Sequence, residues 1–134
     1  MTITRAAGLT TKRGPAEYFT GAVLIDELGA GTGTSRVRVV RVSFEPGART
    51  AWHTHPHGQL LHILSAVARV QRAGQAAVEV QAGDSVWFEP GERHWHGAAP
   101  TGAMTHLAVQ LADDSGSAAT WLEPVSDADY RLEG

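Results

Sequence analysis

Two histidine-rich segments carry the residues whose types and spacing could do chemistry, and that chemistry would be metal binding. The first segment, WHTHPHGQ, begins at Trp52, and the second, GERHWH, begins at Gly91. Histidines separated by one residue on a strand point to the same face, because side chains alternate with a period of two. An amide oxygen follows four residues after this pair, and a later histidine is distant enough to return on a neighbouring strand. The spacing predicts one metal ion held by His53, His55, Gln59 and His94.

The donors of this predicted site are all neutral, so a divalent ion that they hold keeps its full charge. Such an ion favours anionic ligands, among them cyanide, hydroxide, an alkoxide and an enolate, and it stabilises developing negative charge as a Lewis acid. The chain has no cysteine, which excludes disulfides, thiolate ligands and iron-sulfur clusters. Nitrogen and oxygen donors accept manganese, iron, nickel, zinc or cobalt, and the donor types do not choose among these metals.

Short strands separated by glycine and proline turns must position these residues, because helical periodicity is nearly absent from the sequence. Regularly spaced strands of this kind predict an all-β sandwich or barrel. We expect a hairpin loop at residues 29–35 and a short C-terminal helix over residues 126–134, with Ser126 as its N-cap. The expected strands cover residues 20–26, 37–44, 51–55, 60–64, 68–72, 76–80, 85–88, 94–97, 104–111 and 120–124.

Side-chain alternation along two of these strands assigns one wall of a pocket. His106, Ala108 and Gln110 share one face of a late strand, and that face is polar with one small residue. Val40 and Val42 share a face of an earlier strand. We predict that all of these side chains line the pocket.

The strand that follows Gln59 shows the same alternation. Leu61 and Ile63 share the face of Gln59, so we expect both beneath the metal, whereas His62 points outward. Arg38 lies on the pocket face of its own strand, and we expect its charge nearer an open end of the fold.

Other polar residues have simpler interpretations. His57 lies in a proline-histidine-glycine turn and is expected to face solvent. His96 shares its face with the preceding histidine and is either a pocket residue or a hydrogen-bonding partner of a ligand. His106 and Gln110 also fit a satisfied buried polar pair, and Arg49 fits a loop anchor rather than a substrate clamp. The expected role of Trp52, Trp87, Trp95 and Trp121 is packing in the core and at interfaces.

The two histidine segments belong to longer patterns. Gly-x5-His-x-His-x3-Gln from Gly47, followed by Gly-x5-Glu-x-Gly-x2-His from Gly83, resembles the two motifs of the cupin superfamily. The resemblance implies an all-β jelly-roll barrel, or double-stranded β-helix, that forms a single domain over residues 1–134 with its metal-binding core at about 37–111. The usual Glu, Gly, Pro and Asn of the motifs are replaced by Gln59, Ala66, Glu89 and Ala98. Because alanine takes a positive φ less readily than glycine, Ala66 puts the turn between residues 64 and 68 in doubt.

Three segments are similar to the small manganese-dependent bacterial hydroxynitrile lyases within that superfamily. They are GPAEYFTG from Gly14, FEPGARTAWHTHP from Phe44 and HWHGAAP from His94. This resemblance implies Mn²⁺ held by three histidines and one glutamine, with a pocket histidine and glutamine on a later strand. The corresponding residues are His53, His55, Gln59, His94, His106 and Gln110.

From these features we expect a metal-dependent lyase that cleaves or forms small cyanohydrins. His106, of a residue type whose ordinary pKa is about 6.5, is the expected general base, and Gln110 would orient substrate or water. The expected pocket residues are Val40, Val42, Leu61, Ile63, His96 and Ala108. Two other classes stay open: a cupin dioxygenase that uses iron, nickel or copper, and a cupin that binds a small molecule without turning it over.

Composition bounds the partners. A formal net charge of -3 gives no basic surface for nucleic acid, and no apolar run approaches the roughly 20 residues of a membrane-spanning helix. No signal-peptide core follows the N-terminus, so we expect a cytoplasmic protein with a small-molecule substrate. Exposed apolar strand faces and four tryptophans predict a homodimer or homotetramer.

Overall fold

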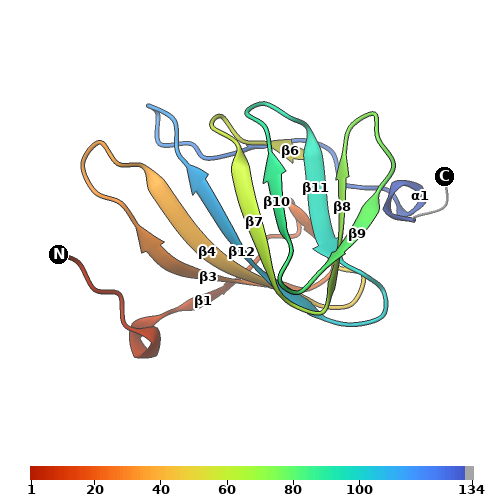
Figure 1. Ribbon diagram of the computed structural model, residues 1–134, viewed down its shortest axis with the longest axis horizontal. Helices are drawn as coiled ribbons and strands as arrows, with labels where there is room; N and C mark the ends of the chain where they lie inside the picture. Colours follow the sequence, from red (N-terminus) through yellow and green to blue (C-terminus); the bar gives the residue numbers. More distant parts are fainter. Residues whose placement is uncertain (132–134) are drawn as a thin grey trace.

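The strands form two twisted β-sheets (Figure 1). The sheets enclose the hydrophobic core and a cavity. The computed structural model describes residues 1–131 of the chain. The first sheet runs in the order β1 (Thr11–Arg13), β3 (Val23–Ala30), β4 (Val37–Phe44), β12 (Met104–Leu111), β7 (Gln59–Ser65) and β10 (Ser85–Phe88). The second runs in the order β13 (Thr120–Trp121), β6 (His53–Thr54), β11 (His94–Ala98), β5 (Arg49–Thr50) and β2 (Phe19–Thr20). To this sheet β11 adds a pairing with β8 (Val67–Arg72), which pairs in turn with β9 (Val78–Gln81).

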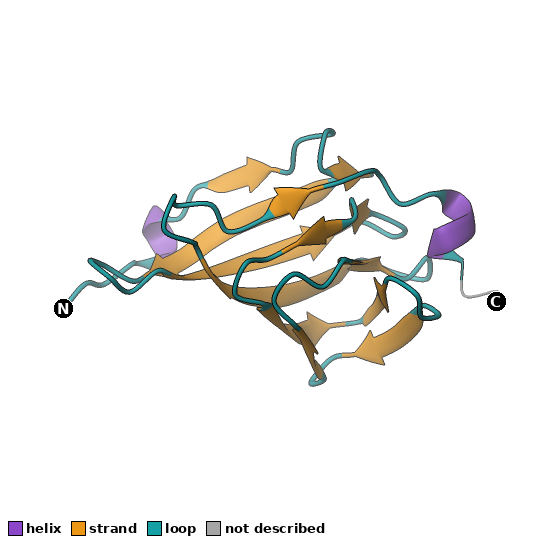
Figure 2. Cartoon of the chain, turned by 90° about the horizontal axis from the view of Figure 1, so that it is seen from above, coloured by secondary structure: helices purple, strands orange, loops and turns teal. Residues whose placement is uncertain are grey.

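Helical structure is confined, in the described residues, to a 3-10 turn at Ala6–Gly8 and to α1 (Asp127–Tyr130). The predicted all-β class with a short C-terminal helix is therefore confirmed. Figure 2 shows α1 beyond one end of the strands, with the N-terminus at the opposite end. The predicted N-cap is also confirmed, because the Ser126 side chain accepts a hydrogen bond from the Asp129 backbone N–H. The last part of the predicted helix, residues 132–134, lies outside the described residues.

Three strands have the predicted bounds, at residues 37–44, 85–88 and 104–111, whereas one predicted strand is divided and another is shortened to two residues. The strand predicted at 20–26 breaks at Gly21, whose φ of 82° leaves the extended conformation. A Cβ at Gly21 would stand 2.9 Å from the Cβ of Ala48, so glycine also permits a close approach of two segments.

The strand predicted at 51–55 reduces to β6 because its first residues bond elsewhere. The Ala51 N–H donates to the Tyr18 carbonyl, and the Trp52 N–H donates to the Glu123 carbonyl. The prediction missed β1, whose three residues are all exposed and leave no burial pattern to read.

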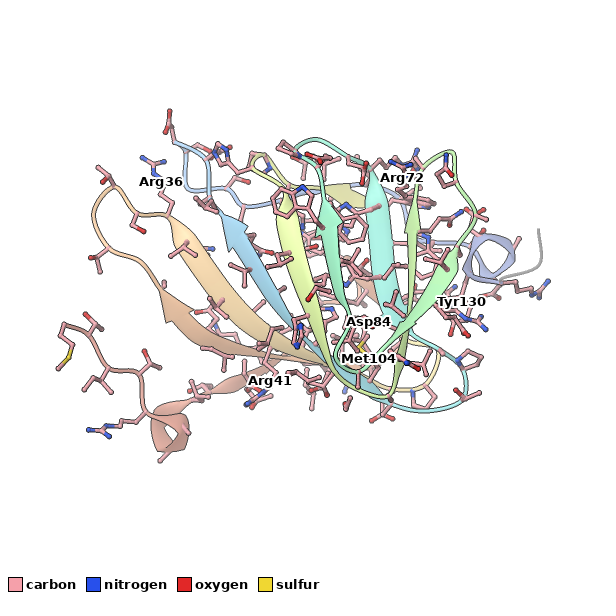
Figure 3. The ribbon with its side chains drawn as sticks, in the orientation of Figure 1. Arg36, Arg41, Arg72, Asp84, Met104 and Tyr130 are labelled. Atoms are coloured by element: carbon pink, nitrogen blue, oxygen red, sulfur yellow. The ribbon has the colours of Figure 1, made fainter. Side chains whose placement is uncertain are left out.

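The central strands β4 and β12 set the inward face of the first sheet. In their antiparallel register His106 lies opposite Val42, Ala108 opposite Val40 and Gln110 opposite Arg38. Burial alternates along β12 from Met104 to Ala108, so the predicted parity of this strand is confirmed. Figure 3 shows Arg36, which precedes β4, and Met104, which begins β12, at opposite ends of the sheet. The Met104 end is filled by the core, and the Arg36 end leads to the cavity.

The doubtful turn between β7 and β8 does form, with Ala66 at a φ of 61°. A left-handed conformation costs a residue with a Cβ about 1–2 kcal/mol. The Ala66 carbonyl accepts a hydrogen bond of 3.0 Å from the Ala82 N–H, which ties the turn to the chain after β9. Tertiary contacts therefore impose a conformation that the local sequence disfavours.

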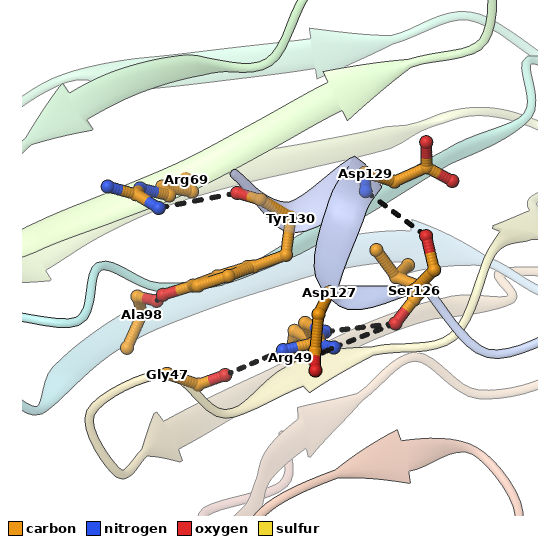
Figure 4. A network of polar contacts seen from close by, with 9 residues as sticks. Gly47, Arg49, Arg69, Ala98, Ser126, Asp127, Asp129 and Tyr130 are labelled. Carbon is orange, nitrogen blue, oxygen red and sulfur yellow. Dashed lines mark hydrogen bonds and ion pairs between the residues drawn. The ribbon is translucent and has the colours of Figure 1, made fainter. Parts of the chain in front are cut away.

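The C-terminal segment is fastened to the second sheet by a group that we call the C-terminal latch: Arg49, Arg69, Asp127 and Tyr130 (Figure 4). The Tyr130 ring lies within 4.6 Å of the Arg49 guanidinium and 4.9 Å of the Arg69 guanidinium. Its hydroxyl donates to the Ala98 carbonyl at 2.6 Å. Arg49 is only 6% exposed and donates to the Val125 carbonyl and to Asp127. The prediction that Arg49 anchors a loop is confirmed.

Large apolar side chains remain exposed on the outer face of the first sheet. Leu60 and Trp87 are paired across β7 and β10 and are 39% and 50% exposed, with Leu64 and Leu111 nearby on the same and the adjoining strand. Self-association through this face stays a prediction. No helix among the described residues is long and apolar enough to cross a membrane.

Candidate metal centre

A cavity of about 750 Å³ lies between the two sheets. Four of the six predicted pocket residues line it: Val40, Val42, His96 and Ala108. The other two, Leu61 and Ile63, have no exposed surface and pack in the core clusters instead of on the cavity wall. Arg38 lines the cavity and is exposed, as expected for a residue near its opening. Strand parity placed Leu61 and Ile63 on the correct side of the sheet but did not give their depth.

Five buried histidines from β6, β11, β12 and the loop after β6 gather at this cavity. His53, His55, His96 and His106 line it, and His94 contacts His53 and Gln59. His53 and His94 are directly opposite each other in the register of β6 and β11. One ring nitrogen from each of His53, His94 and His96 lies within 4.8 Å of the others, so a three-histidine cluster is present. The ring of His55 is centred 4.9 Å from that of His53 and 5.4 Å from that of His94.

Backbone carbonyls fix the tautomer of three of these rings. Nδ1 of His53 lies 2.8 Å from the Ala51 carbonyl, and Nδ1 of His94 lies 2.8 Å from the Glu92 carbonyl. Nδ1 of His55 lies 2.6 Å from the Ala118 carbonyl. Because a carbonyl oxygen only accepts, each Nδ1 carries the proton and each Nε2 keeps a lone pair. This is the arrangement in which histidines bind metals through Nε2.

Burial keeps all five rings neutral. It lowers the pKa of His94 to about 3 and that of His106 to about 4. Burial also lowers the pKa of His53 and His96 well below the ordinary value, with a further contribution from neighbouring imidazoles, and lowers the pKa of His55. Neutral imidazole is the form that binds a metal, so the cluster needs no deprotonation at neutral pH.

Gln59 brings an amide oxygen to the same cluster. Its Oε1 lies 3.1 Å from Nε2 of His94, and its Nε2 donates to Oε1 of Gln110 at 2.7 Å. Since the His94 proton is on Nδ1, the 3.1 Å contact joins two atoms that both present lone pairs. A metal ion held by both atoms would use both lone pairs, for which the protein itself supplies no donor in this contact. The residues present therefore fit a metal ion.

His96 and His106 form a separate pair at the cavity wall. Nδ1 of His96 lies 3.0 Å from Nε2 of His106. The other nitrogens of this pair, Nε2 of His96 and Nδ1 of His106, are buried without a hydrogen-bond partner, as is Nε2 of His55. Nε2 of His94 belongs with them, because its one polar contact is with the Gln59 oxygen, which also presents lone pairs.

The remaining predicted polar residues occupy simpler positions. His57 is exposed, as predicted, and His62 points away from the cavity and contacts the Ser85 hydroxyl at 2.8 Å. The predicted alternative of a His106–Gln110 pair is not formed, because His106 contacts His96 and Gln110 contacts Gln59.

Trp121 is one of the wall residues that the sequence prediction missed, and Phe19, Ile25 and Thr50 are others. Trp121 lines the cavity, its ring is centred 4.7 Å from that of His53, and it stacks on Tyr18 at 4.7 Å. The register of β13 with β6 places Trp121 directly opposite His53. Strand 120–124 was predicted, but its pairing with a segment more than sixty residues earlier has no local signal.

The chain is similar to known proteins along almost its whole length. The model of the cupin domain matches residues 40–109. A curated (R)-mandelonitrile lyase from Granulicella tundricola is 52% identical over 131 residues, which are 98% of this chain and 99% of that protein. A solved cupin-like protein from Thermotoga maritima is 37% identical with a TM-score of 0.82, over 89% of this chain and 90% of that one. A polyketide cyclase from Streptomyces resistomycificus shares the fold, with 16% identity and a TM-score of 0.73 over 97% of this chain and 90% of that one.

Proposed function

Because this chain belongs to the cupin family and is 52% identical to a mandelonitrile lyase, we propose that it is a metal-dependent lyase that cleaves or forms small cyanohydrins. The observation that carries the proposal is the group of buried imidazole nitrogens without partners in one cavity. An unpartnered buried polar atom costs about 1–3 kcal/mol, so such a group is retained where a ligand or substrate uses it.

The proposed metal ligands are His53, His55, Gln59 and His94. Their support is the fixed tautomer of the three histidines and the lone-pair contact between His94 and Gln59. His96 is also close enough to share a metal, but its Nδ1 is engaged by His106 and not by a carbonyl. Manganese is proposed on the resemblance to manganese-dependent lyases, since these donors also suit iron, nickel, zinc and cobalt. When bound, the metal supplies positive charge that stabilises departing cyanide or a developing alkoxide.

His106 is proposed to take the hydroxyl proton of the cyanohydrin. At neutral pH its ring is neutral, and it has a lone pair on Nδ1 when its Nε2–H donates to His96. As the proton leaves, the electron pair of the O–H bond forms the carbonyl, the bond to the nitrile carbon breaks, and its pair departs with cyanide.

His96 completes the proton balance. In this tautomer its Nε2 carries a proton that can pass to cyanide and give hydrogen cyanide, while the Nε2–H of His106 moves to Nδ1 of His96. Both rings end neutral with their tautomers exchanged. The lowered pKa of His106 makes it a weaker base than an ordinary histidine, and positive charge beside the substrate oxygen would offset this by making the hydroxyl more acidic.

The experiment is metal analysis of the purified protein, joined to a mandelonitrile cleavage assay before and after chelation and manganese restoration. We expect cleavage that is lost on chelation and returns with manganese. The His106→Ala variant should lower kcat at least about 100-fold, because general bases contribute about 10²–10⁴. The control is His62→Ala, which removes a histidine outside the cavity and should leave kcat within about twofold. Bound metal without cleavage contradicts the proposal, and oxygen uptake with an enol or catechol would favour a dioxygenase.

A metal titration tests the choice of ligands. We expect His55→Ala to weaken manganese binding at least about 100-fold and His96→Ala to weaken it less than about tenfold while lowering kcat. The reverse order would assign His96 to the metal and His55 to the wall.

A further inference from the structure

Gln110 has a defined partner that is not the substrate. It lies directly opposite Gln59 in the register of β12 with β7, and the two amides are joined by the 2.7 Å hydrogen bond from Gln59 to Gln110. Gln59 is 3% exposed, whereas Gln110 is half-buried and lines the cavity. The pairing of two sheet strands therefore builds this contact, and no bound molecule is needed to form it.

The direction of this hydrogen bond sets which end of the Gln59 amide reaches the histidine cluster. While Nε2 of Gln59 donates to Gln110, Oε1 must point toward Nε2 of His94. Oxygen has lone pairs for a metal, whereas the amide nitrogen has none to offer. When the nitrogen of the Gln59 amide donates to Gln110, the oxygen of the same amide is therefore free to bind a metal beside His94.

The same pair has a second satisfied arrangement. If both amides turn over, Gln110 donates to Oε1 of Gln59, and Nε2 of Gln59 donates to the lone pair of His94. That arrangement pairs His94 without a metal and removes the oxygen ligand. The two amides therefore have one arrangement that accepts a metal and one that excludes it. A side chain at position 110 that accepts the hydrogen bond from Gln59 selects the first arrangement, and one that donates to Gln59 selects the second.

We propose that Gln110 is a positioning residue that holds the amide oxygen of Gln59 toward the metal position, and that it acts through Gln59 and not through contact with substrate. The inference rests on the metal site proposed above. It predicts that an acceptor at position 110 favours metal binding and that an apolar residue there weakens it.

The test is a double-mutant cycle on metal affinity, read by manganese titration of the chelated full-length protein. The variants are Gln110→Leu, Gln59→Leu and the double variant. We expect Gln110→Leu to weaken manganese binding about 10- to 100-fold, the usual range for a residue that orients a ligand. In the Gln59→Leu background the same change should cost less than about twofold, because there is no amide left to orient.

A conservative variant supplies the rescue. Gln110→Glu offers only acceptor oxygens, so Gln59 must donate to it, and affinity should stay within about threefold of the wild type or rise. A carboxylate could also attract the cation directly, and Gln59→Leu combined with Gln110→Glu measures that effect. The matched control is Gln81→Leu at an exposed position of β9, which should leave manganese affinity unchanged.

The outcomes separate the two proposals. Equal losses for Gln110→Leu in the wild-type and Gln59→Leu backgrounds would overturn the positioning role. So would a metal-saturated Gln110→Leu variant with unchanged metal affinity and a KM for mandelonitrile raised tenfold, since Gln110 would then contact substrate. Manganese binding that depends on Gln59 and Gln110 without any cleavage supports the inference and rejects only the lyase activity. A wild-type protein that binds no metal overturns both.

Discussion

The two sides of β11 carry polar networks that use their hydrogen bonds in opposite ways. On the cavity side, His94 and His96 belong to a cluster that leaves buried nitrogens without partners. On the other side, Trp95 packs against Tyr130, and the C-terminal latch satisfies its polar groups. The Arg49 side chain donates to three acceptors, the carbonyls of Gly47 and Val125 and the carboxylate of Asp127. Trp95 and Arg49 are 0% and 6% exposed, as buried as the cavity histidines, so the burial of single residues does not separate function from structure here.

The two sides of β11 differ instead in how many buried polar atoms lack a hydrogen-bond partner. A buried donor or acceptor that pairs within the protein contributes to folding, and one left without a partner destabilises the fold by about 1–3 kcal/mol. The latch follows the first pattern and the cavity follows the second. The unpaired nitrogens on the cavity side of β11 destabilise the fold, and contacts elsewhere in the protein offset that cost. Variants on the two sides should therefore change different measurements.

The largest expected effect comes from breaking the cavity side at its centre. His94→Ala removes an imidazole whose Nε2 faces Gln59 and whose register partner is His53. Manganese affinity should fall at least about 1000-fold, or about 4 kcal/mol. Stability of the metal-free protein should change by less than about 2 kcal/mol, because the variant also relieves a contact between two lone pairs. Manganese titration and urea unfolding of the metal-free protein check both parts. A variant that loses much more stability than expected but keeps its manganese affinity would contradict the contrast between the two sides.

The next largest effect comes from breaking the latch. Arg49→Met keeps most of the side-chain volume but leaves the buried Val125 carbonyl without its donor and separates Asp127 from its cation. We expect a loss of about 3 kcal/mol in the free energy of unfolding. Manganese affinity, measured at a temperature where the variant is folded, should stay within about threefold. A large loss of affinity would show that the latch supports the metal centre directly.

A smaller change in the C-terminal latch separates the contribution of one hydroxyl from that of the arginine. Tyr130→Phe removes the hydroxyl that donates to Ala98 but keeps the ring between the guanidinium groups of Arg49 and Arg69. The expected loss is about 1–2 kcal/mol, because one buried carbonyl is left unpaired while the stacking remains. Urea unfolding measures it, and a loss as large as that of Arg49→Met would mean that the hydroxyl and not the arginine organises the latch.

The sequence predicted which face of a sheet a side chain points to better than whether that side chain lies in the core or at the cavity. Alternation within a strand is a local property, so the inward face of β12 with His106 and Ala108 followed from the residues alone. The motif spacing likewise brought His53 and His94 together, because both belong to strands that pair in the cupin fold. Depth along a strand depends on where the sheets close, and this is why Leu61 and Ile63 lie in the core and not at the cavity.

Long-range partners were beyond local patterns for a related reason. Trp121 reaches His53 through the pairing of β13 with β6, and Gln110 reaches Gln59 through the pairing of β12 with β7. Each partner is a polar or aromatic residue that would also suit other neighbours, so composition does not select it. The strained turn at Ala66 is a further case, since contacts from the segment after β9 hold a conformation that alanine disfavours.

The smallest expected effect is the acid sensitivity of the latch. The hydrogen bond and charge of Arg49 lower the pKa of Asp127 below its ordinary value of 3.8. Because the folded pKa is the lower one, the pair stabilises the fold fully above the unfolded pKa and loses this contribution as pH falls through the folded pKa. The contribution is small and falls with added salt, since the Asp127 side chain is 83% exposed. Urea unfolding between pH 6 and pH 3, values on either side of this ordinary pKa, should show a steeper loss of stability for the wild type than for Asp127→Asn. Other carboxylates with lowered pKa values, such as Asp26, cancel in this difference. In the Arg49→Met background the Asp127→Asn change should no longer alter the pH dependence, and a persistent difference there would place the partner of Asp127 outside the latch.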